Sequence, residues 1–306
     1  MNGIIIIDKP ADWTSHDVIA KLRGALKQKR IGHGGTLDPM ATGVLPVFIG
    51  RATRAAEFCE NAEKEYIAEL LLGTVTDTQD ITGTVLQENK INVTVDDLSA
   101  VLPSFTGEQK QIPPMYSAIK KNGKKLYELA RKGIEIEREP RSINISKLEI
   151  CDCDSGDKGT VLLSTCQENR PSVTLRIVCS KGTYIRTLCH DIGAALGCGG
   201  TLSALRRIRA GAFHIDTAHT LDNVLATSLT DSVNSLLLPV DSIFPELQAI
   251  TLSEAETRKA KNGARCKAQS IIADGKYKVY SPNGEFLLLG EAFDNTITTI
   301  KSFFEV

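Results

Sequence analysis

The sequence predicts a mixed α/β protein of about two domains. Three observations lead to this prediction. Short apolar runs typical of buried strands alternate with amphipathic stretches of helical spacing. The 306 residues exceed the usual size of one domain. The segment 246–306 changes to short apolar runs separated by glycines, which is typical of a small β-rich domain.

The first elements follow from apolar patterning and helix capping. A buried strand is expected at Gly3–Asp8, ended by Lys9-Pro10, and then a helix capped by Ser15 with an apolar stripe at 18, 19, 22 and 26. A strand at 44–49 and a helix at 51–62 are expected next.

The middle of the chain alternates in the same way. A strand is expected at 66–75, a turn-rich segment at 76–83, and a helix capped by Thr94 and running to about Leu102. Asn122-Gly123 predicts a tight hairpin turn, and a helix over 124–132 should end at Gly133.

Strands joined by loops are expected over 142–179, with a polar link at 152–159. The clearest helix is 183–196, for which Thr183 is the expected N-cap and in which Arg186 lies in the first turn.

The net charge of −1 argues against a protein bound to nucleic acid over its whole surface. Residues 221–306 hold eleven Asp or Glu and eight Lys or Arg, so the earlier part of the chain is net basic. Its basic runs are of the kind that phosphate contacts require, and they lie at 21–30, 120–132 and 206–209.

The eight cysteines show no Cys-x-x-Cys spacing, and no signal peptide or membrane segment is apparent. Free thiols in a reducing cytosol are therefore expected, and the localisation is predicted to be cytoplasmic.

One carboxylate stands out. Asp38 lies between the glycines of 32–35 and Pro39, and Pro39 disfavours the α region for the residue before it, so Asp38 is expected to be extended and presented from a loop. A fixed, isolated acid of this kind suits a nucleophile or a proton acceptor. The same Asp-Pro pair is also compatible with an ordinary turn.

The string GGTLDPMATGVLP around Asp38 resembles the catalytic motif of the TruB-type tRNA pseudouridine synthases, bacterial stand-alone enzymes. Further segments resemble the same family in its order and approximate spacing, and the resemblance covers about residues 3–215. These segments are IDKP (7–10), TSHD (14–17), KEYIA (64–68), QIPPMYSAIKKNGKKLYELARKG (111–133), SKGTYIR (180–186) and LRR (205–207).

The resemblance implies an α+β fold, in which a mixed, mainly antiparallel central sheet has flanking helices. It also implies a catalytic domain at 1–245 with an RNA-gripping insertion at about 105–140, followed by a small β-rich PUA-like RNA-binding domain at 246–306.

The resemblance also assigns roles to single residues. Asp38 is implied to be the catalytic residue, with Arg186 beside it to keep it ionised. Tyr66 is implied to stack on the flipped base, Tyr184 to contact the substrate, and Leu205 to close the apolar side of the pocket. His33 is implied to fill the space that the extruded nucleotide leaves. Lower-ranked RNA contacts are Lys9, Lys120, Lys124, Arg131 and Arg206.

The implied reaction isomerises uridine 55 of the tRNA T loop to pseudouridine, with the T arm of tRNA as the partner. Because this isomerisation involves no redox change, no cofactor is expected. No metal is expected either, since Asp77 and Asp80 suit an Asx-rich turn. We expect a monomer that needs no protein partner and no membrane.

Three other interpretations are weighed. A non-catalytic tRNA-binding or folding module would use the basic runs but would have no use for Asp38. A phosphate-binding loop would need Gly-Lys-Ser or Gly-Lys-Thr after its glycines, and Thr-Leu-Asp-Pro follows here. A synthase guided by a separate RNA is disfavoured by the short chain and the bacterial-type insertion.

Overall fold

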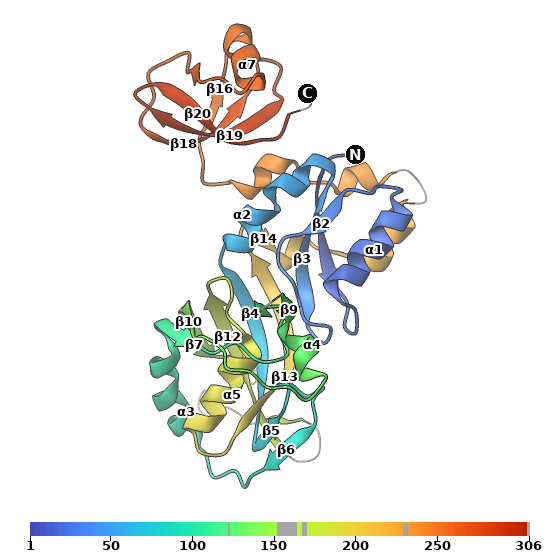
Figure 1. The fold of residues 1–306 in the computed structure, drawn as a ribbon, viewed down its shortest axis with the longest axis vertical. Coiled ribbons are helices and arrows are strands. Elements are labelled where there is room, and N and C mark those ends of the chain that lie inside the picture. Colours follow the sequence, from blue (N-terminus) through green and yellow to red (C-terminus); the bar gives the residue numbers. More distant parts are fainter. Residues whose placement is uncertain (122, 152–163, 167–169, 229–231, 305–306) are drawn as a thin grey trace, which may run out of the picture. The chain divides into compact units, whose positions relative to one another are not determined.

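The structure is a computed structural model that describes residues 1–121, 123–151, 164–166, 170–228 and 232–304. Its residues group into two compact units. The first unit comprises Met1–Pro39, Gly43–Glu60 and Ala210–Val306, and the second comprises Met40–Thr42 and Asn61–Arg209. Figure 1 shows the elements of both units, which are described separately below.

The first unit is built on a strand that is buried on both of its faces. β1 (Gly3–Lys9) pairs antiparallel with β3 (Thr42–Ile49) and parallel with β15 (His219–Thr220), and β2 (Ile31–His33) pairs antiparallel with β3. Side chains alternate between the two faces of a strand, so the isoleucines of β1 enter two different apolar clusters.

On one face, Ile5 and Ile7 pack in a cluster with Val18, Ile19 and Leu22 of α1 (Ser15–Ala25). On the other face, Ile4 and Ile6 pack in a cluster with Phe48, Ala52 and Ala55. The remaining elements of this part of the unit are η1 (Gly50–Ala55), α2 (Ala56–Asn61), β14 (Phe213–His214), η3 (Ile215–Thr217), α6 (Leu221–Ser228), η4 (Ser232–Leu236) and η5 (Val240–Ile243).

The C-terminal part of the first unit forms a five-stranded sheet of its own with one helix. Its strand order is β16 (Ala249–Thr251), β18 (Gly275–Tyr280), β19 (Phe286–Phe293), β20 (Thr296–Ser302) and β17 (Cys266–Lys267), and its helix is α7 (Glu254–Lys261). Leu252, Val279, Leu287 and Leu288 are fully buried in its core. The change to β-rich structure that the sequence predicts after residue 245 is therefore confirmed, whereas the boundary at 245/246 stays a prediction.

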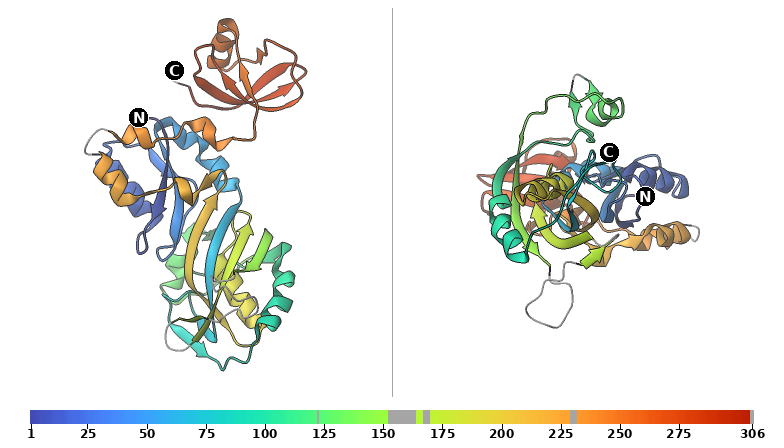
Figure 2. Two further views of the ribbon diagram at one scale, coloured as in Figure 1. Left: turned by 180° about the vertical axis from the view of Figure 1, so that it is seen from behind. Right: turned by 90° about the horizontal axis from the view of Figure 1, so that it is seen from below.

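The second unit contains a long sheet, seen from behind in the left panel of Figure 2. Its strand order is β13 (Gly200–Ala210), β4 (Lys64–Leu72), β12 (Arg170–Cys179), β10 (Arg141–Ile150) and β7 (Gly107–Gln111), with β11 (Ser164–Cys166) beside β12. The printed pairings of β4 with β12, β12 with β10, and β10 with β7 are all antiparallel. The other elements are β5 (Thr74–Thr76), β6 (Val85–Glu88), α3 (Val95–Val101), η2 (Leu102–Phe105), β8 (Lys120–Lys121), β9 (Lys124–Lys125), α4 (Leu126–Ala130) and α5 (Ile185–Ala195).

Several predicted boundaries need correction. The N-cap of α1 is Thr14, which shares a capping box with Asp17, and not Ser15. The N-cap of α5 is Tyr184, because the hydroxyl of Thr183 instead donates to the carbonyl of Ser180.

Three predicted elements are also shorter or divided. The helix expected over 51–62 consists of η1 and α2, and the strand expected over 66–75 is β4 followed by β5. The helix expected over 124–132 is the five-residue α4. The predicted Asn122-Gly123 turn lies partly outside the described residues, and the predicted link at 152–159 lies entirely outside them.

Candidate active site

The loop that carries Asp38 joins β2 to β3 and lies against the start of α1. The hydroxyl of Ser15 accepts a hydrogen bond from the Leu37 amide (2.9 Å) and donates one to the Leu37 carbonyl (3.2 Å). Ser15 is 1% exposed, so no solvent competes for these bonds. The residue before Asp38 is therefore held through both of its backbone polar groups.

The residue after Asp38 is held by a buried lysine. The Nζ atom of Lys9 donates to the carbonyls of Pro10 (2.8 Å), Trp13 (2.6 Å) and Pro39 (3.1 Å), and the Asp12 amide also donates to Pro39 (2.9 Å). Lys9 is 0% exposed. Lys9 is among the predicted RNA contacts, but in this structure its ammonium group faces backbone carbonyls and supports the loop.

Close packing requires a glycine at position 34, at the start of the loop. A Cβ atom on Gly34 would lie 2.8 Å from the Cβ of Cys59 and 2.8 Å from the ring of Phe48. The Gly34 amide donates to the Pro46 carbonyl (2.9 Å). Only glycine allows this approach, which brings the loop down onto β3.

His33 ends β2, opposite Val47 of β3. Its ring meets the ring of His16 edge to face, with 5.4 Å between the ring centroids. His16 lies in the first turn of α1. The structure thus brings Lys9, His33 and the Asp38 loop together in the first unit.

The second unit gathers a second set of candidate residues around the start of α5. The guanidinium of Arg186 lies 5.8 Å from the centre of the Tyr184 ring. Arg186 is 6% exposed; its Nη2 donates to the Tyr116 carbonyl (2.7 Å), and its Nη1 lies 3.5 Å from the Oδ2 of Asp80.

Asp80 forms an ion pair with Arg186, whereas the sequence analysis predicted only that Asp80 belongs to a turn. It is 4% exposed, and its Oδ1 accepts hydrogen bonds from the hydroxyls of Thr78 (2.8 Å) and Thr82 (2.6 Å) and from the Thr82 amide (3.0 Å). Bonds of this kind stabilise a carboxylate, so Asp80 can balance the charge of Arg186. The turn assignment is consistent with these local bonds, but it missed the ion pair, for which the sequence gives no signal.

Two further contacts attach this turn to its surroundings. The Thr187 hydroxyl donates to the side chain of Gln79 (2.7 Å). The Leu202 amide donates to the Gln79 carbonyl (3.1 Å), and the Ile81 amide donates to the Leu202 carbonyl (3.0 Å). Among the described residues, no group of three or more His, Cys, Asp or Glu is placed to hold a metal ion.

Three more candidate residues lie on the sheet of this unit. Tyr66 of β4 stands opposite Ile177 of β12, and Tyr66 and Leu205 are each 8% exposed. Arg206 of β13 donates to the hydroxyl of Thr42 (3.3 Å), which belongs to the continuation of the Asp38 motif. The half-buried position of Arg206 leaves only part of its side chain for RNA.

The neighbour of Tyr66 belongs to a charged network across three strands. Glu65 of β4 binds Arg176 of β12 (Oε1 to Nε, 2.6 Å) and Arg209 of β13 (Oε2 to Nε, 3.0 Å). Burial by itself raises the pKa of Glu65, but the hydrogen bonds from Arg209 and Arg176 outweigh it and hold the pKa below its usual value.

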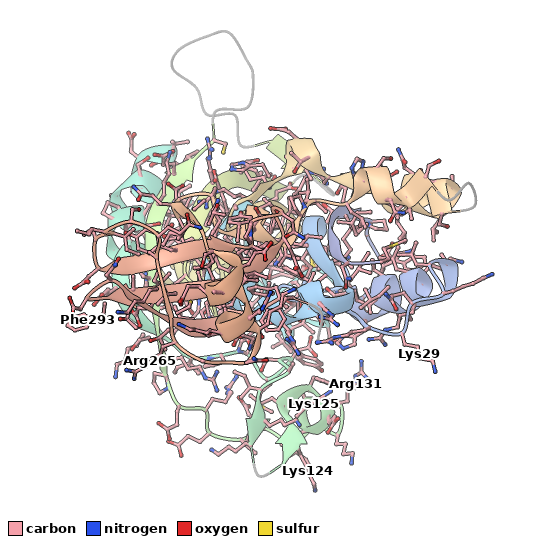
Figure 3. All side chains as sticks on the ribbon, turned by 90° about the horizontal axis from the view of Figure 1, so that it is seen from above. Lys29, Lys124, Lys125, Arg131, Arg265 and Phe293 are labelled. Carbon is pink, nitrogen blue, oxygen red and sulfur yellow. The ribbon has the colours of Figure 1, made fainter. Side chains whose placement is uncertain are left out.

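The predicted RNA-contacting residues of the insertion are exposed. Lys120 and Lys124 lie on the β8–β9 hairpin, and Arg131 follows α4. Lys125 and Arg131 each lie 5.3 Å from the centre of the Tyr127 ring. Figure 3 shows Lys124, Lys125 and Arg131 close together on the segment that carries β9 and α4.

In the part of the chain that the structure describes, no helix is long and apolar enough to cross a membrane.

Comparison with solved structures confirms the predicted fold class. The chain resembles a crystal structure of a Cbf5–Nop10–Gar1 complex with a TM-score of 0.72 at 26% identity, covering 99% of this chain and 85% of that one. It resembles an archaeal box H/ACA Nop10–Cbf5 complex with a TM-score of 0.67 at 25% identity, covering 99% and 86%. The protein therefore has the pseudouridine synthase fold, and its C-terminal sheet is a PUA-like domain.

Sequence comparison agrees. Residues 23–185 match the N-terminal domain of the TruB family of pseudouridylate synthases, and residues 186–245 match the C-terminal domain of tRNA pseudouridylate synthase B. A tRNA pseudouridine synthase B from Syntrophomonas wolfei is 43% identical over 95% of this chain and 94% of its own length. Another from Clostridium kluyveri is 40% identical over 99% of this chain and 100% of its own length. The chain belongs to the TruB family of pseudouridylate synthases and is an enzyme of the isomerase class.

Proposed function

We propose that this enzyme converts uridine 55 in the T loop of tRNA to pseudouridine, with Asp38 as its catalytic residue. The relatives named tRNA pseudouridine synthase B support tRNA as the substrate. The observation that carries the role of Asp38 is the fixing of its two neighbours, Leu37 by Ser15 and Pro39 by Lys9. A carboxylate held in this way is preorganised for reaction, because little reorientation is needed when the substrate arrives.

The proposed reaction needs a reactive group but no redox partner. The bond between N1 of uracil and C1′ of ribose breaks, the base turns, and a bond forms between C5 and C1′. The proton on C5 is lost and N1 gains one, so atoms and electrons balance without a cofactor.

Asp38 supplies the group that starts this sequence. Its carboxylate has three routes: attack on C1′ of the ribose, addition to the base, or removal of a ribose proton to give a glycal. Each route needs the ionised form, which a cation beside the carboxylate favours, and in this proposal Arg186 has that role.

The other candidates act on the same nucleotide in this proposal. A uridine inside a folded T loop has to be flipped out before it can react. Tyr66 supplies the stacking face for the flipped base, Tyr184 contacts it, and Leu205 closes the apolar side. His33 fills the space that the nucleotide leaves.

The partner in this proposal is the T arm of tRNA, gripped by the exposed basic residues of the insertion. The enzyme acts as a monomer without a guide RNA, a protein partner or a cofactor. The chain covers nearly the whole length of relatives named tRNA pseudouridine synthase B, which supports tRNA as the partner.

The test is an unmodified tRNA transcript with chemical mapping of pseudouridine. Wild-type enzyme should place pseudouridine at position 55, and Asp38→Asn should lower the single-turnover rate by at least about 10²- to 10⁴-fold, the range for loss of an acid/base group. The tRNA affinity of the variant should be unchanged.

Asp12→Asn is the matched control. Asp12 lies beside the loop, and its backbone amide, which holds Pro39, survives the substitution. Its left-handed backbone (φ 64°) also tolerates Asn. Normal activity of Asp38→Asn would refute the catalytic assignment to Asp38. No pseudouridine with the wild type would favour a tRNA-binding or folding module, and pseudouridine at another position would refute the assignment to position 55.

A further inference from the structure

The insertion of the second unit leaves and rejoins the sheet at a single pair of residues. β7 ends at Gln111 and β10 begins at Arg141, and these two residues face each other across the antiparallel ladder. The segment 112–140, which carries the exposed Lys120, Lys124 and Arg131, therefore begins and ends at this one residue pair of the sheet.

The side chain of Gln111 connects this residue pair to the start of α5 through hydrogen bonds. Its Oε1 accepts a hydrogen bond from the Tyr184 amide (2.8 Å), and its Nε2 donates one to the Tyr184 carbonyl (3.1 Å). Gln111 is 6% exposed. A carboxamide that binds both backbone groups of one residue fixes the position of that residue and also the orientation of its peptide groups.

α5 needs such an external tie. Tyr184 is its N-cap residue, and no side-chain capping hydrogen bond is present there. Helix starts with free amides fray unless another group binds them. From β7, Gln111 binds one of these amides, that of Tyr184 itself, whereas a Ser or Asp at the cap would bind an amide two or three residues further on.

A second contact lies beyond this residue pair. The Tyr116 carbonyl accepts a hydrogen bond from Arg186, one residue into α5 from its first residue. The insertion thus meets the start of α5 at Tyr184 through Gln111 and at Arg186 through Tyr116. Gln111 contributes its side chain to the first contact, whereas Tyr116 contributes only its backbone carbonyl to the second.

We propose that Gln111 is a positioning residue for pseudouridine formation: it holds the Tyr184–Arg186 segment in a fixed place relative to the base of the RNA-binding insertion. Gln111 touches neither the base nor the ribose. It acts through Tyr184 and Arg186, so this inference rests on the function proposed above.

The test uses two variants and one control in the full-length enzyme. Gln111→Met keeps the length and volume of the side chain and removes both bonds. Gln111→Glu keeps an acceptor for the Tyr184 amide but has no donor at neutral pH for the Tyr184 carbonyl. Gln109→Met is the control, because Gln109 lies on the same strand and its amide bonds only locally, to the Phe105 carbonyl (2.6 Å).

Single-turnover rate and tRNA dissociation constant are measured separately on the unmodified transcript, and the thermal midpoint checks folding. Both Gln111 variants should slow the single-turnover rate by about 10- to 100-fold, the cost of a small misplacement at a reacting centre, with little change in tRNA affinity. Gln109→Met should match the wild type. If Gln111→Met folds poorly, Gln111→Glu decides.

Wild-type rates in a folded Gln111 variant would overturn the proposal. A loss confined to tRNA affinity would also overturn it, since Gln111 would then contribute to RNA binding and not to the reaction step. Failure of the proposed function would instead be seen in the wild type. If the wild type modifies another position, the Gln111 variants are assayed at that position. If the wild type modifies no position, the proposed function and the role of Gln111 are both refuted.

Discussion

At the scale of single residues, Ser15 is the least conspicuous member of the Asp38 loop. One hydroxyl serves as both donor and acceptor for Leu37. Replacement by Ala would leave two buried backbone groups without this partner, and a lost partner costs about 1–3 kcal/mol for each buried group. The loop would then lose part of its hold on the residue that precedes Asp38.

We therefore predict that Ser15→Ala lowers the free energy of unfolding by about 2–6 kcal/mol, the cost of two such groups, and slows the single-turnover rate by about tenfold or more. Urea unfolding and rapid-quench assays on tRNA would measure these two quantities. Ser104→Ala is the control, because Ser104 is exposed and donates only to the Val101 carbonyl. A normal rate in Ser15→Ala would show that the loop holds its shape without this hydroxyl.

At the scale of elements, Glu65 links three neighbouring strands. Its two carboxylate oxygens bind arginines from β12 and β13, while Tyr66, the next residue of β4, points to the opposite face. Glu65→Gln would keep the shape but remove the charge that both arginines contact. Hydrogen bonds to charged groups contribute about 1.5–3 kcal/mol, so we predict a loss of this size at pH 7.

This loss should depend on pH in one direction. The folded-state pKa of Glu65 is lowered, so its stabilising contribution is fully present above the unfolded-state pKa of about 4.3 and disappears as the pH falls through the folded-state pKa. The stability difference between wild type and Glu65→Gln should be constant from pH 8 to about pH 5 and shrink below about pH 4. Glu254→Gln, at an exposed pair with Arg258, should show almost no difference at any pH. A difference that grew on acidification would contradict the network.

Elements also show where sequence-based prediction succeeded. Thr94 was predictable as an N-cap because the capping box with Asp97 is a local pattern. The capping box of Thr14 with Asp17 is equally local, but Ser15 was predicted as the N-cap because it also carries a hydroxyl. That hydroxyl instead binds Leu37, which is distant in the sequence. Asp80 and Gln111 find their partners through tertiary contacts, for which a single sequence carries no signal.

At the scale of the whole molecule, the near-zero net charge conceals an uneven distribution. The acidic excess lies in residues 221–306, and the exposed cations of the insertion form a local basic surface. Attraction to phosphate falls off within about 10 Å at 0.1 M salt, so the local surface and not the net charge decides RNA binding.

Lys120, Lys124 and Arg131 provide a quantitative test of this view. Each phosphate that a cation neutralises adds about 0.9 to the magnitude of the slope of log K against log salt concentration. Replacing all three with Ala should therefore reduce that magnitude by about 2 to 3 and weaken tRNA binding most at low salt. The control exchanges Lys120 and Lys124 for Arg and Arg131 for Lys, which keeps the charge at each position and should keep the slope. An unchanged slope in the triple Ala variant would place the RNA grip on another part of the chain and leave the insertion without the role proposed for it.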